Sequence, residues 1–325
     1  MASTLIQPKL IIHGGAGSSL RGKGGEEAVR KLLFGIVDQV YALLQAGATA
    51  QAAVIQGCRL LEDEPRFNAG TGSVLQSDGQ IRMSAALMDG MAQRFSGVIN
   101  VSRIKNPIEL AEFLQGCSDR VLSDVGAAEL VRELKLPTHD PLTDLRLQEW
   151  IAERNNDFSR DMAGVIAEVE PAPEAASEIG AEAGRGTIGV VALDQAGRLA
   201  VGTSTGGKGF ERIGRVSDSA MPAGNYASAQ AAVSCTGIGE DIIDECLAPR
   251  IVVRVADGLA LADAFARSFK EAGAHQRDLG AIGLSHDGAI AWGKTSEVLL
   301  AAYHNGTQKG DTLALAPGVV TGHCN

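Results

Sequence analysis

The chain has 325 residues, of which 45% are hydrophobic, 21% charged and 4% aromatic, and its formal net charge is −10. This is an ordinary globular composition, long enough for one large domain or two small ones. The negative charge, without a notable run of lysine or arginine, argues against a general nucleic-acid-binding surface. The 40 glycines indicate many tight turns and close backbone contacts.

The sequence also argues against a membrane protein. No apolar stretch approaches the roughly 18–20 residues that a spanning helix needs, and the first residues lack the basic region and long apolar core of a signal peptide. The five cysteines form no CxxC pair, which suits free thiols in a reducing compartment. We therefore expect a cytoplasmic protein without a membrane partner.

Hydrophobic periodicity predicts most elements in the first half of the chain. In chain order these are a strand at 10–12 that ends in a glycine turn at 13–17, helices at 26–45 and 50–61, a loop at 67–72, short strands ending at 88–90, and helices at 107–115, 126–134 and 144–153.

Composition changes at residues 168–186, which read EVEPAPEAASEIGAEAGRG. Val169 and Ile179 are the only large apolar residues in this segment. It cannot bury enough apolar surface to offset the entropy of ordering it, so we expect it to be mobile. A linker between two domains is one interpretation, and a tail that ends at a cleavage point is another.

A β-hairpin is predicted directly after this segment. Residues 187–194 and 198–205 read as two strands joined by the turn Gln195-Ala196-Gly197. This spacing places Thr187 opposite Thr205. Facing residues have Cβ atoms roughly 4.5–5.5 Å apart and point to the same face, so two hydroxyl groups should meet at the open end of the hairpin.

The rest of the second half contains further predicted elements. These are helices near 225–233, 239–247 and 259–271, a short apolar segment at 231–235, and a second hairpin with strands at 281–285 and 289–292.

Thr187 is the candidate nucleophile. A free threonine hydroxyl is a poor nucleophile and needs a base. Cleavage before Thr187 would supply one, because the new α-amino group has an unperturbed pKa of roughly 7.7–8.0. Gly186 suits such a cleavage, since a residue without a side chain lets the peptide bend until the hydroxyl reaches the preceding carbonyl. The alternative is that Thr187 is a β-branched residue that merely begins a strand.

No other nucleophile is convincing. The six histidines are scattered, so no Ser/His/Asp arrangement can be picked out. Residues 202–206 spell GxSxG, but a nucleophile elbow has to open a helix. Here Gly-Lys-Gly follows at 207–209 and indicates a loop, so we interpret the match as chance.

Two further groups of residues suit substrate chemistry. The turn from Thr236 through Gly237 to Gly239 enters a predicted helix, where unpaired backbone N–H groups can stabilise an oxyanion; an ordinary glycine-built helix entry is the alternative. Arg215 and Asp218 could grip the carboxylate and the ammonium of an α-amino acid. Their alternative is a solvated surface pair of little energetic value.

These segments together resemble the plant-type asparaginase and isoaspartyl peptidase family. The β-subunit signature is matched by Thr187–Asp194, Thr203–Gly207, Gly214–Ser219 and Ser234–Glu240, and the α-subunit half by Ile12–Gly17, Leu61-Glu62, Phe67–Gly70 and Met88–Gly90. The resemblance covers nearly the whole chain. Each motif alone is weak, but their shared order and spacing are specific.

The resemblance implies a fold, a cleavage of the precursor and an assembly. The fold is the α+β, four-layer αββα sandwich of the N-terminal-nucleophile hydrolases. The precursor is cleaved between Gly186 and Thr187 into an α subunit, 1–186, and a β subunit, 187–325, which stay together as one folded domain. Two such pairs form a dimer of heterodimers. Catalysis needs no cofactor.

The resemblance also implies a role for each site residue. Thr187 is the nucleophile and, through its amine, the base, and Thr205 hydrogen-bonds to it and tunes it. Thr236 and Gly237 form the oxyanion hole. Arg215 and Asp218 hold the substrate α-carboxylate and α-amino group, with Gly239 lining the same pocket.

Two further implied roles are structural. Asn68 steadies the precursor, and the backbone carbonyls of Leu61, Glu62, Phe67 and Ala69 hold a structural sodium ion.

We expect the chain to hydrolyse β-aspartyl amide bonds, in L-asparagine or in β-aspartyl dipeptides. A glycosylasparaginase and a threonine-dependent endopeptidase on the same fold are alternatives within enzymes. From another class, a non-catalytic amino-acid-binding protein that never matures is also an alternative.

Overall fold

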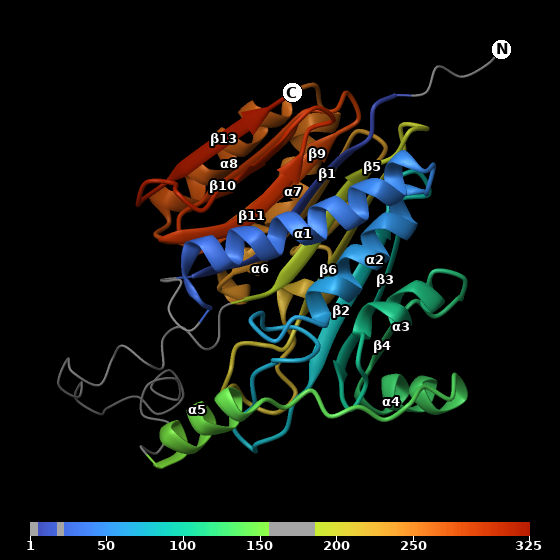
Figure 1. The fold of residues 1–325 in the computed structure, drawn as a ribbon, viewed down its shortest axis with the longest axis vertical. Coiled ribbons are helices and arrows are strands. Elements are labelled where there is room, and N and C mark those ends of the chain that lie inside the picture. Colours follow the sequence, from blue (N-terminus) through green and yellow to red (C-terminus); the bar gives the residue numbers. More distant parts are fainter. Residues whose placement is uncertain (1–5, 18–22, 156–185) are drawn as a thin grey trace.

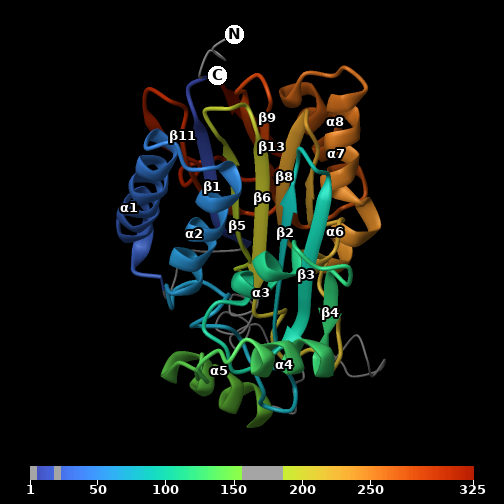
Figure 2. The ribbon, with the colours of Figure 1, turned by 90° about the vertical axis from the view of Figure 1, so that its right-hand side faces the viewer.

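The computed structural model describes residues 6–17, 23–155 and 186–325. The chain has the α+β, four-layer αββα sandwich of the N-terminal-nucleophile hydrolases: two sheets lie face to face, and helices cover the outer face of each (Figure 1; Figure 2). Apart from Gly186, the segment predicted to be mobile, 168–186, lies outside the described residues.

The first sheet has eight strands in the order β12-β11-β1-β5-β6-β2-β3-β4. Their bounds are β1 Lys9–Gly17, β2 Met83–Asp89, β3 Arg94–Val101, β4 Val121–Ser123, β5 Ile188–Leu193, β6 Leu199–Thr205, β11 Val298–His304 and β12 Lys309–Asp311. All neighbours pair antiparallel except β3 and β4. Strands from both sides of the 186–187 peptide bond are interleaved in this sheet.

The second sheet has five strands in the order β13-β10-β9-β8-β7. Their bounds are β7 Asn225–Ala227, β8 Ala231–Gly237, β9 Leu279–Ser285, β10 Ile290–Lys294 and β13 Val320–Cys324. Strands β8 and β9 pack face to face against β1, β5 and β6 of the first sheet.

The helices divide between the two outer faces (Figure 2). The first sheet is covered by α1 (Gly25–Gln45), α2 (Ala50–Glu62), α3 (Pro107–Leu114) and α4 (Asp124–Glu133), and the second by α6 (Gly239–Glu245), α7 (Leu247–Ala256) and α8 (Leu261–Ala274). Helix α5 (Asp144–Asn155) lies at one end of the sandwich, where Trp150 Nε1 donates to the Gln76 carbonyl at 2.9 Å.

Alternation along β5 explains the layering. Ile188 and Val190 face the helix side and pack with α1 and α2, whereas Val191 and Leu193 face the second sheet. A strand that is buried on both faces carries a nearly continuous apolar run, which is why 187–194 reads so densely. Burying a large aliphatic side chain contributes roughly 1.5–3 kcal/mol, so this central hairpin is strongly held.

Most sequence-predicted elements are confirmed with small shifts at their ends. The helices predicted at 26–45, 50–61, 107–115, 126–134 and 144–153 correspond to α1 to α5, those predicted at 239–247 and 259–271 to α6 and α8, and the hairpins to β5–β6 and β9–β10.

Three predictions are corrected. Strand β1 does not end in a turn at 13–17 but continues to Gly17 through a bulge between His13 and Ala16. The helix predicted near 225–233 is wrong, because these residues form β7 and the start of β8. The short strands ending at 88–90 are one strand, β2. The helix prediction fails because the apolar run at 231–233 pairs with β7 just before it and with the distant strand β9.

None of the helices in the described part of the chain is both long enough and apolar enough to span a bilayer.

Candidate active site

The β5–β6 hairpin brings Thr187 and Thr205 together as their spacing predicts. Ile188 faces Ser204, and the Thr187 hydroxyl donates to Thr205 Oγ1 at 3.1 Å. Thr205 Oγ1 also accepts the backbone N–H of Gly207 at 3.2 Å. Both threonines are buried. Because Thr205 accepts a hydrogen bond from the Thr187 hydroxyl, it holds the Thr187 oxygen in one orientation.

Asn68 joins the segments around the Gly186–Thr187 peptide bond. Its backbone N–H donates to the Gly186 carbonyl at 3.1 Å, and its carbonyl accepts from Gly206 N at 2.9 Å. Its side chain donates to the Gly207 carbonyl at 2.8 Å and accepts from Val74 N at 3.0 Å. The carbonyl beside Thr187 is therefore fixed by an N–H group, which is the contact that a developing negative charge on that oxygen needs.

The bulge in β1 reaches both Gly186 and the predicted oxyanion residue Thr236. Gly15 has φ +118°, and a Cβ there would lie 2.6 Å from Gly186 Cα, so only glycine fits. The next residue, Ala16, donates its N–H to Thr236 Oγ1 at 3.0 Å. Since Thr236 accepts from the backbone, its own hydroxyl proton is available to a ligand.

Gly237 follows Thr236 at the end of β8. It has φ +125°, and a Cβ there would lie 2.6 Å from Leu279 Cα. Any other residue would be strained and would clash with backbone, so the turn that leads from β8 into α6 depends on this glycine.

Arg215 and Asp218 lie together, at Gly239, where α6 begins. A Cβ on Gly239 would be 2.7 Å from Arg215 Nη2 and 2.8 Å from Asp218 Oδ1. Glycine at this position therefore leaves the guanidinium and the carboxylate close to each other. The predicted grouping of these three residues agrees with their positions in the structure.

Asp218 is a buried carboxylate at the start of a short 3₁₀ turn, Asp218–Ala220. Burial raises its pKa to about 7, although the neighbouring Arg215 acts in the opposite direction. Asp218 Oδ2 has no hydrogen-bond partner among the residues that the structure describes. An unpaired buried oxygen favours an added donor such as an ammonium group.

A hollow of about 380 Å³ lies beside Arg215. It is lined by Ser77, Lys208–Arg215 and Glu240. The loop that forms most of it starts directly after Gly207, whose N–H contacts Thr205. Of the sequence-predicted site residues, only Arg215 lines this hollow, so it opens to solvent beside the guanidinium and not at the threonines.

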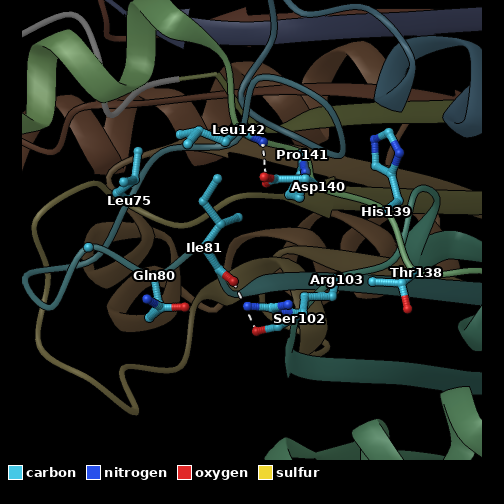
Figure 3. Close-up of a pocket in the computed structure, with 11 residues that line it drawn as sticks. Leu75, Gln80, Ile81, Ser102, Arg103, Thr138, His139, Asp140, Pro141 and Leu142 are labelled. Carbon is cyan, nitrogen blue, oxygen red and sulfur yellow. Dashed lines mark hydrogen bonds between the residues drawn. The ribbon is translucent and has the colours of Figure 1, made fainter.

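Another hollow, of about 250 Å³, lies away from the predicted site residues (Figure 3). Its polar groups largely satisfy one another: Ser102 Oγ donates to the Ile81 carbonyl, and Leu142 N donates to Asp140 Oδ1. None of the sequence-predicted site residues lines it, so it is separate from the catalytic candidates.

Sequence reasoning missed a buried polar cluster beneath β5. His13 Nε2 is 2.9 Å from Ser234 Oγ, which is 2.7 Å from Thr203 Oγ1. All three residues are fully buried, and burial lowers the pKa of His13 to about 3, so its imidazole is neutral. A Ser–His pair sealed between two sheets cannot meet a substrate. The cluster links β1, β6 and β8. The sequence signal that could have revealed it is the presence of polar residues within otherwise apolar strands.

The loop that resembles a sodium site is tightly wound. The Leu61 and Glu62 carbonyls accept the backbone N–H groups of Glu64 and Thr71, at 3.3 and 2.8 Å. A Cβ on Gly72 would lie 2.9 Å from the carbonyl oxygen of Phe67. No His, Cys, Asp and Glu side chains gather into a metal-binding group of three or more within 6–17, 23–155 and 186–325. Any ion in this loop would be held by carbonyl oxygens.

The candidate site as a whole combines a buried hydroxyl pair, a threonine hydroxyl whose proton is available, and a charged pair. This combination suits acyl transfer from an amide of a zwitterionic amino acid.

Comparisons with known proteins agree with this chemistry. A family model described as "Asparaginase" matches residues 6–314. The isoaspartyl peptidase/L-asparaginase of Nostoc sp. is 70% identical over 317 residues, 98% of each chain. The protein of the same name from Synechocystis sp. is 65% identical over 96% of this chain and 92% of its own length. The plant-type L-asparaginase of Pyrococcus horikoshii is 36% identical over 74% of this chain and 76% of its own.

The family model spans almost the whole chain and both groups of predicted site residues. This chain therefore belongs to the asparaginase family of N-terminal-nucleophile hydrolases.

Proposed function

We propose that the chain is the precursor of a hydrolase that acts on β-aspartyl amide bonds, in L-asparagine, in β-aspartyl dipeptides or in both. The observation that carries the proposal is the Thr187–Thr205 hydroxyl pair beside the Gly186 carbonyl. The names of the Nostoc and Synechocystis relatives supply the substrate class.

Maturation is the first reaction. The Thr187 hydroxyl attacks the Gly186 carbonyl carbon and its proton passes to the Thr187 nitrogen. The Gly186–Thr187 C–N bond breaks, which leaves an ester on Thr187 Oγ1. The Asn68 N–H stabilises the negative charge on the Gly186 oxygen during attack. Water then cleaves the ester, giving fragments 1–186 and 187–325 and a free amine on Thr187.

Hydrolysis of substrate reuses the same hydroxyl. The Thr187 amine accepts the hydroxyl proton while Oγ1 attacks the side-chain carbonyl carbon of the substrate. The oxyanion is stabilised by the Thr236 hydroxyl and the Gly237 N–H. The amine then protonates the leaving nitrogen, so ammonia or an amino acid departs. Water, deprotonated by the same amine, cleaves the β-aspartyl ester and releases L-aspartate.

Substrate selection depends on the charged pair. Arg215 binds the α-carboxylate and Asp218 the α-ammonium group, and Gly239 leaves room for both. A buried charge that loses its partner is costly. We therefore expect N-acetyl-asparagine and asparagine amide to be very poor substrates.

A gel of the purified protein, combined with N-terminal sequencing, tests the proposal. The wild type should yield two fragments, the smaller beginning Thr-Ile-Gly-Val, whereas Thr187→Ala should stay one band of 33.7 kDa without activity. Release of ammonia from asparagine and of amino acids from β-aspartyl dipeptides is measured on the same samples. A wild type that remains one band and only binds amino acids would instead be a binding protein, and another N-terminus would exclude Thr187 as nucleophile.

The assembly and the sodium ion are part of the same proposal. Two pairs of fragments form a dimer of heterodimers, by resemblance to the family. The backbone carbonyls of Leu61, Glu62, Phe67 and Ala69 would ligate the sodium ion, by resemblance to the family. A melting temperature that is higher in NaCl than in choline chloride of equal ionic strength supports the ion, and equal values exclude a stabilising role.

A further inference from the structure

Glu240 holds the guanidinium of Arg215 along one edge. Arg215 Nε lies 2.8 Å from Glu240 Oε1, and Arg215 Nη2 lies 3.0 Å from Oε2. The Arg215 side chain is 13% exposed, whereas that of Glu240 is 52% exposed. Bidentate Arg–carboxylate pairs are the geometrically specific form of this interaction.

The pair leaves the other edge of the guanidinium available. A guanidinium has five N–H donors in a rigid plane, and Glu240 uses only the Nε–H and one Nη2–H. The second Nη2–H and one Nη1–H form the next edge of the plane and are not used by Glu240. Nη2 also lies close to Gly239, beside Asp218 Oδ1. A second carboxylate can therefore bind Arg215 without displacing Glu240.

The backbone of Glu240 is held in a packed helix. It lies in the first turn of α6, which packs against β8 and against the 3₁₀ turn that carries Asp218. Arg215 lies in an irregular loop. Its backbone N–H donates to the Arg212 carbonyl at 3.1 Å, and its carbonyl accepts from Asn100 Nδ2 at 3.2 Å. Without Glu240 the long arginine side chain would have several rotamers open to it.

The charges around Arg215 support this interpretation. Three carboxyl groups face it: Glu240, Glu211 and Asp218. Burial raises the pKa values of Glu211 and Asp218, whereas the hydrogen bond from Arg215 lowers the pKa of Glu240 despite partial burial. Of the three, Glu240 is the carboxylate that Arg215 holds by direct hydrogen bonds.

We infer that Glu240 is a positioning residue for substrate recognition, which orients Arg215 so that its free edge receives the α-carboxylate of the β-aspartyl substrate. This inference rests on the proposed function of the same site. Glu240 does not touch the reacting atoms, so its loss should weaken binding and leave the chemical step nearly unchanged. The opposite reading, in which Glu240 competes with substrate for Arg215, predicts tighter binding when Glu240 is removed.

The test compares Glu240→Gln with Asp244→Asn. Asp244 lies on the same helix and pairs with Arg277 at 3.0 Å, so its variant also removes one exposed carboxylate from α6 but leaves Arg215 alone. For Glu240→Gln we expect a KM for L-asparagine raised about 5- to 30-fold, a kcat within about twofold of wild type, and normal two-fragment maturation. The range corresponds to the loss of charge-assisted hydrogen bonds.

Product analogues separate positioning from structural damage. L-Aspartate carries the α-carboxylate and β-alanine lacks it. The inhibition constant of L-aspartate should rise in parallel with KM, while that of β-alanine should not change. A KM that is unchanged or lowered, a fall in kcat alone, or an equal weakening of both inhibitors would overturn the inference. An inactive or uncleaved wild type would instead refute the proposed function.

Discussion

Asp218 is a site residue whose charge changes near neutral pH. Burial raises its pKa to about 7, against the influence of Arg215. Below that pH the carboxyl is mostly neutral and cannot pair with an ammonium group. We expect the inhibition constant of L-aspartate to be about tenfold higher at pH 6 than at pH 8. At pH 6 the Asp218 carboxyl is ionised in about one protein molecule in ten, whereas at pH 8 it is ionised in nearly all.

Asp218→Asn provides the control for this titration. It should bind L-aspartate weakly at every pH, with a flat profile between pH 6 and 8. A carboxyl whose pKa is raised by folding binds more protons when folded, so its contribution to stability falls as pH rises between about 4 and 7. The variant should therefore melt no lower than the wild type at pH 8. A flat profile in the wild type would contradict the role of Asp218.

Thr236 can be tested by removing only its hydroxyl. Its oxygen accepts the Ala16 N–H, which leaves its proton for the oxyanion. Thr236→Val keeps the β-branched shape, and we expect kcat on L-asparagine to fall about 10²–10³-fold, which is typical for the loss of one oxyanion donor. Thr236→Ser keeps the hydroxyl and should retain most activity. Normal turnover by a matured Thr236→Val enzyme would rule out the assigned role.

At the residue scale, sequence could predict what local spacing determines. The Thr187–Thr205 contact follows from one turn length, and it is present at 3.1 Å. Glu240 could not be selected as the partner of Arg215, because 25 residues separate them and surface ion pairs are the usual fate of such charges. The roles of these residues in catalysis stay predictions.

At the scale of elements, the β5–β6 hairpin depends on the small size of Gly189. A Cβ there would lie 2.1 Å from Ser234 Oγ and 2.3 Å from His13 Nε2. We expect Gly189→Ala to destabilise the protein by about 1–3 kcal/mol, the usual range for overpacking, and to lower the melting temperature by several degrees.

Two further variants sharpen this measurement. Gly35→Ala in α1 meets no atom within 4 Å, so it should be neutral or should stabilise the helix by about 0.5–1 kcal/mol. Ser234→Ala combined with Gly189→Ala removes one of the two obstacles and should recover part of the loss, measured as non-additivity in a double-mutant cycle. Equal melting temperatures for wild type and Gly189→Ala would show that β5 moves away freely.

Element prediction succeeded where periodicity is local and failed where partners are distant. Helix α1 has a clear apolar stripe, including Val29, Leu33 and Ile36, and its ends were predicted within one residue. The helix prediction for 225–233 failed because the run Ala231–Val233 fits a helix or a strand equally well. The run is a strand because it pairs with β9, some fifty residues later. The β1 bulge likewise depends on contacts with Gly186 and Thr236.

At the scale of the whole molecule, the strand order of the first sheet interleaves the two sides of the predicted cleavage point. Strand β1 lies between β11 and β5, and β2 pairs with β6. This order could not be predicted from local sequence patterns, because neighbouring strands such as β1 and β11 are nearly 300 residues apart. The family resemblance predicted the αββα sandwich but not the register of its strands.

This interleaving predicts how the matured protein behaves. The fragments 1–186 and 187–325 share one sheet through the ladders of β1 with β5 and β11 and of β2 with β6. Separating them would expose these strands and the apolar residues packed on both faces of β5, which amounts to global unfolding. We therefore expect the cut fragments to co-elute in size-exclusion chromatography under native conditions and to dissociate only at the denaturant concentration that unfolds the protein. Uncut Thr187→Ala is the matched control. It should unfold at a similar but slightly higher denaturant concentration, because its chain is continuous. Release of either fragment in folded form, or at a denaturant concentration well below the unfolding midpoint, would show that the two parts are separate domains after all.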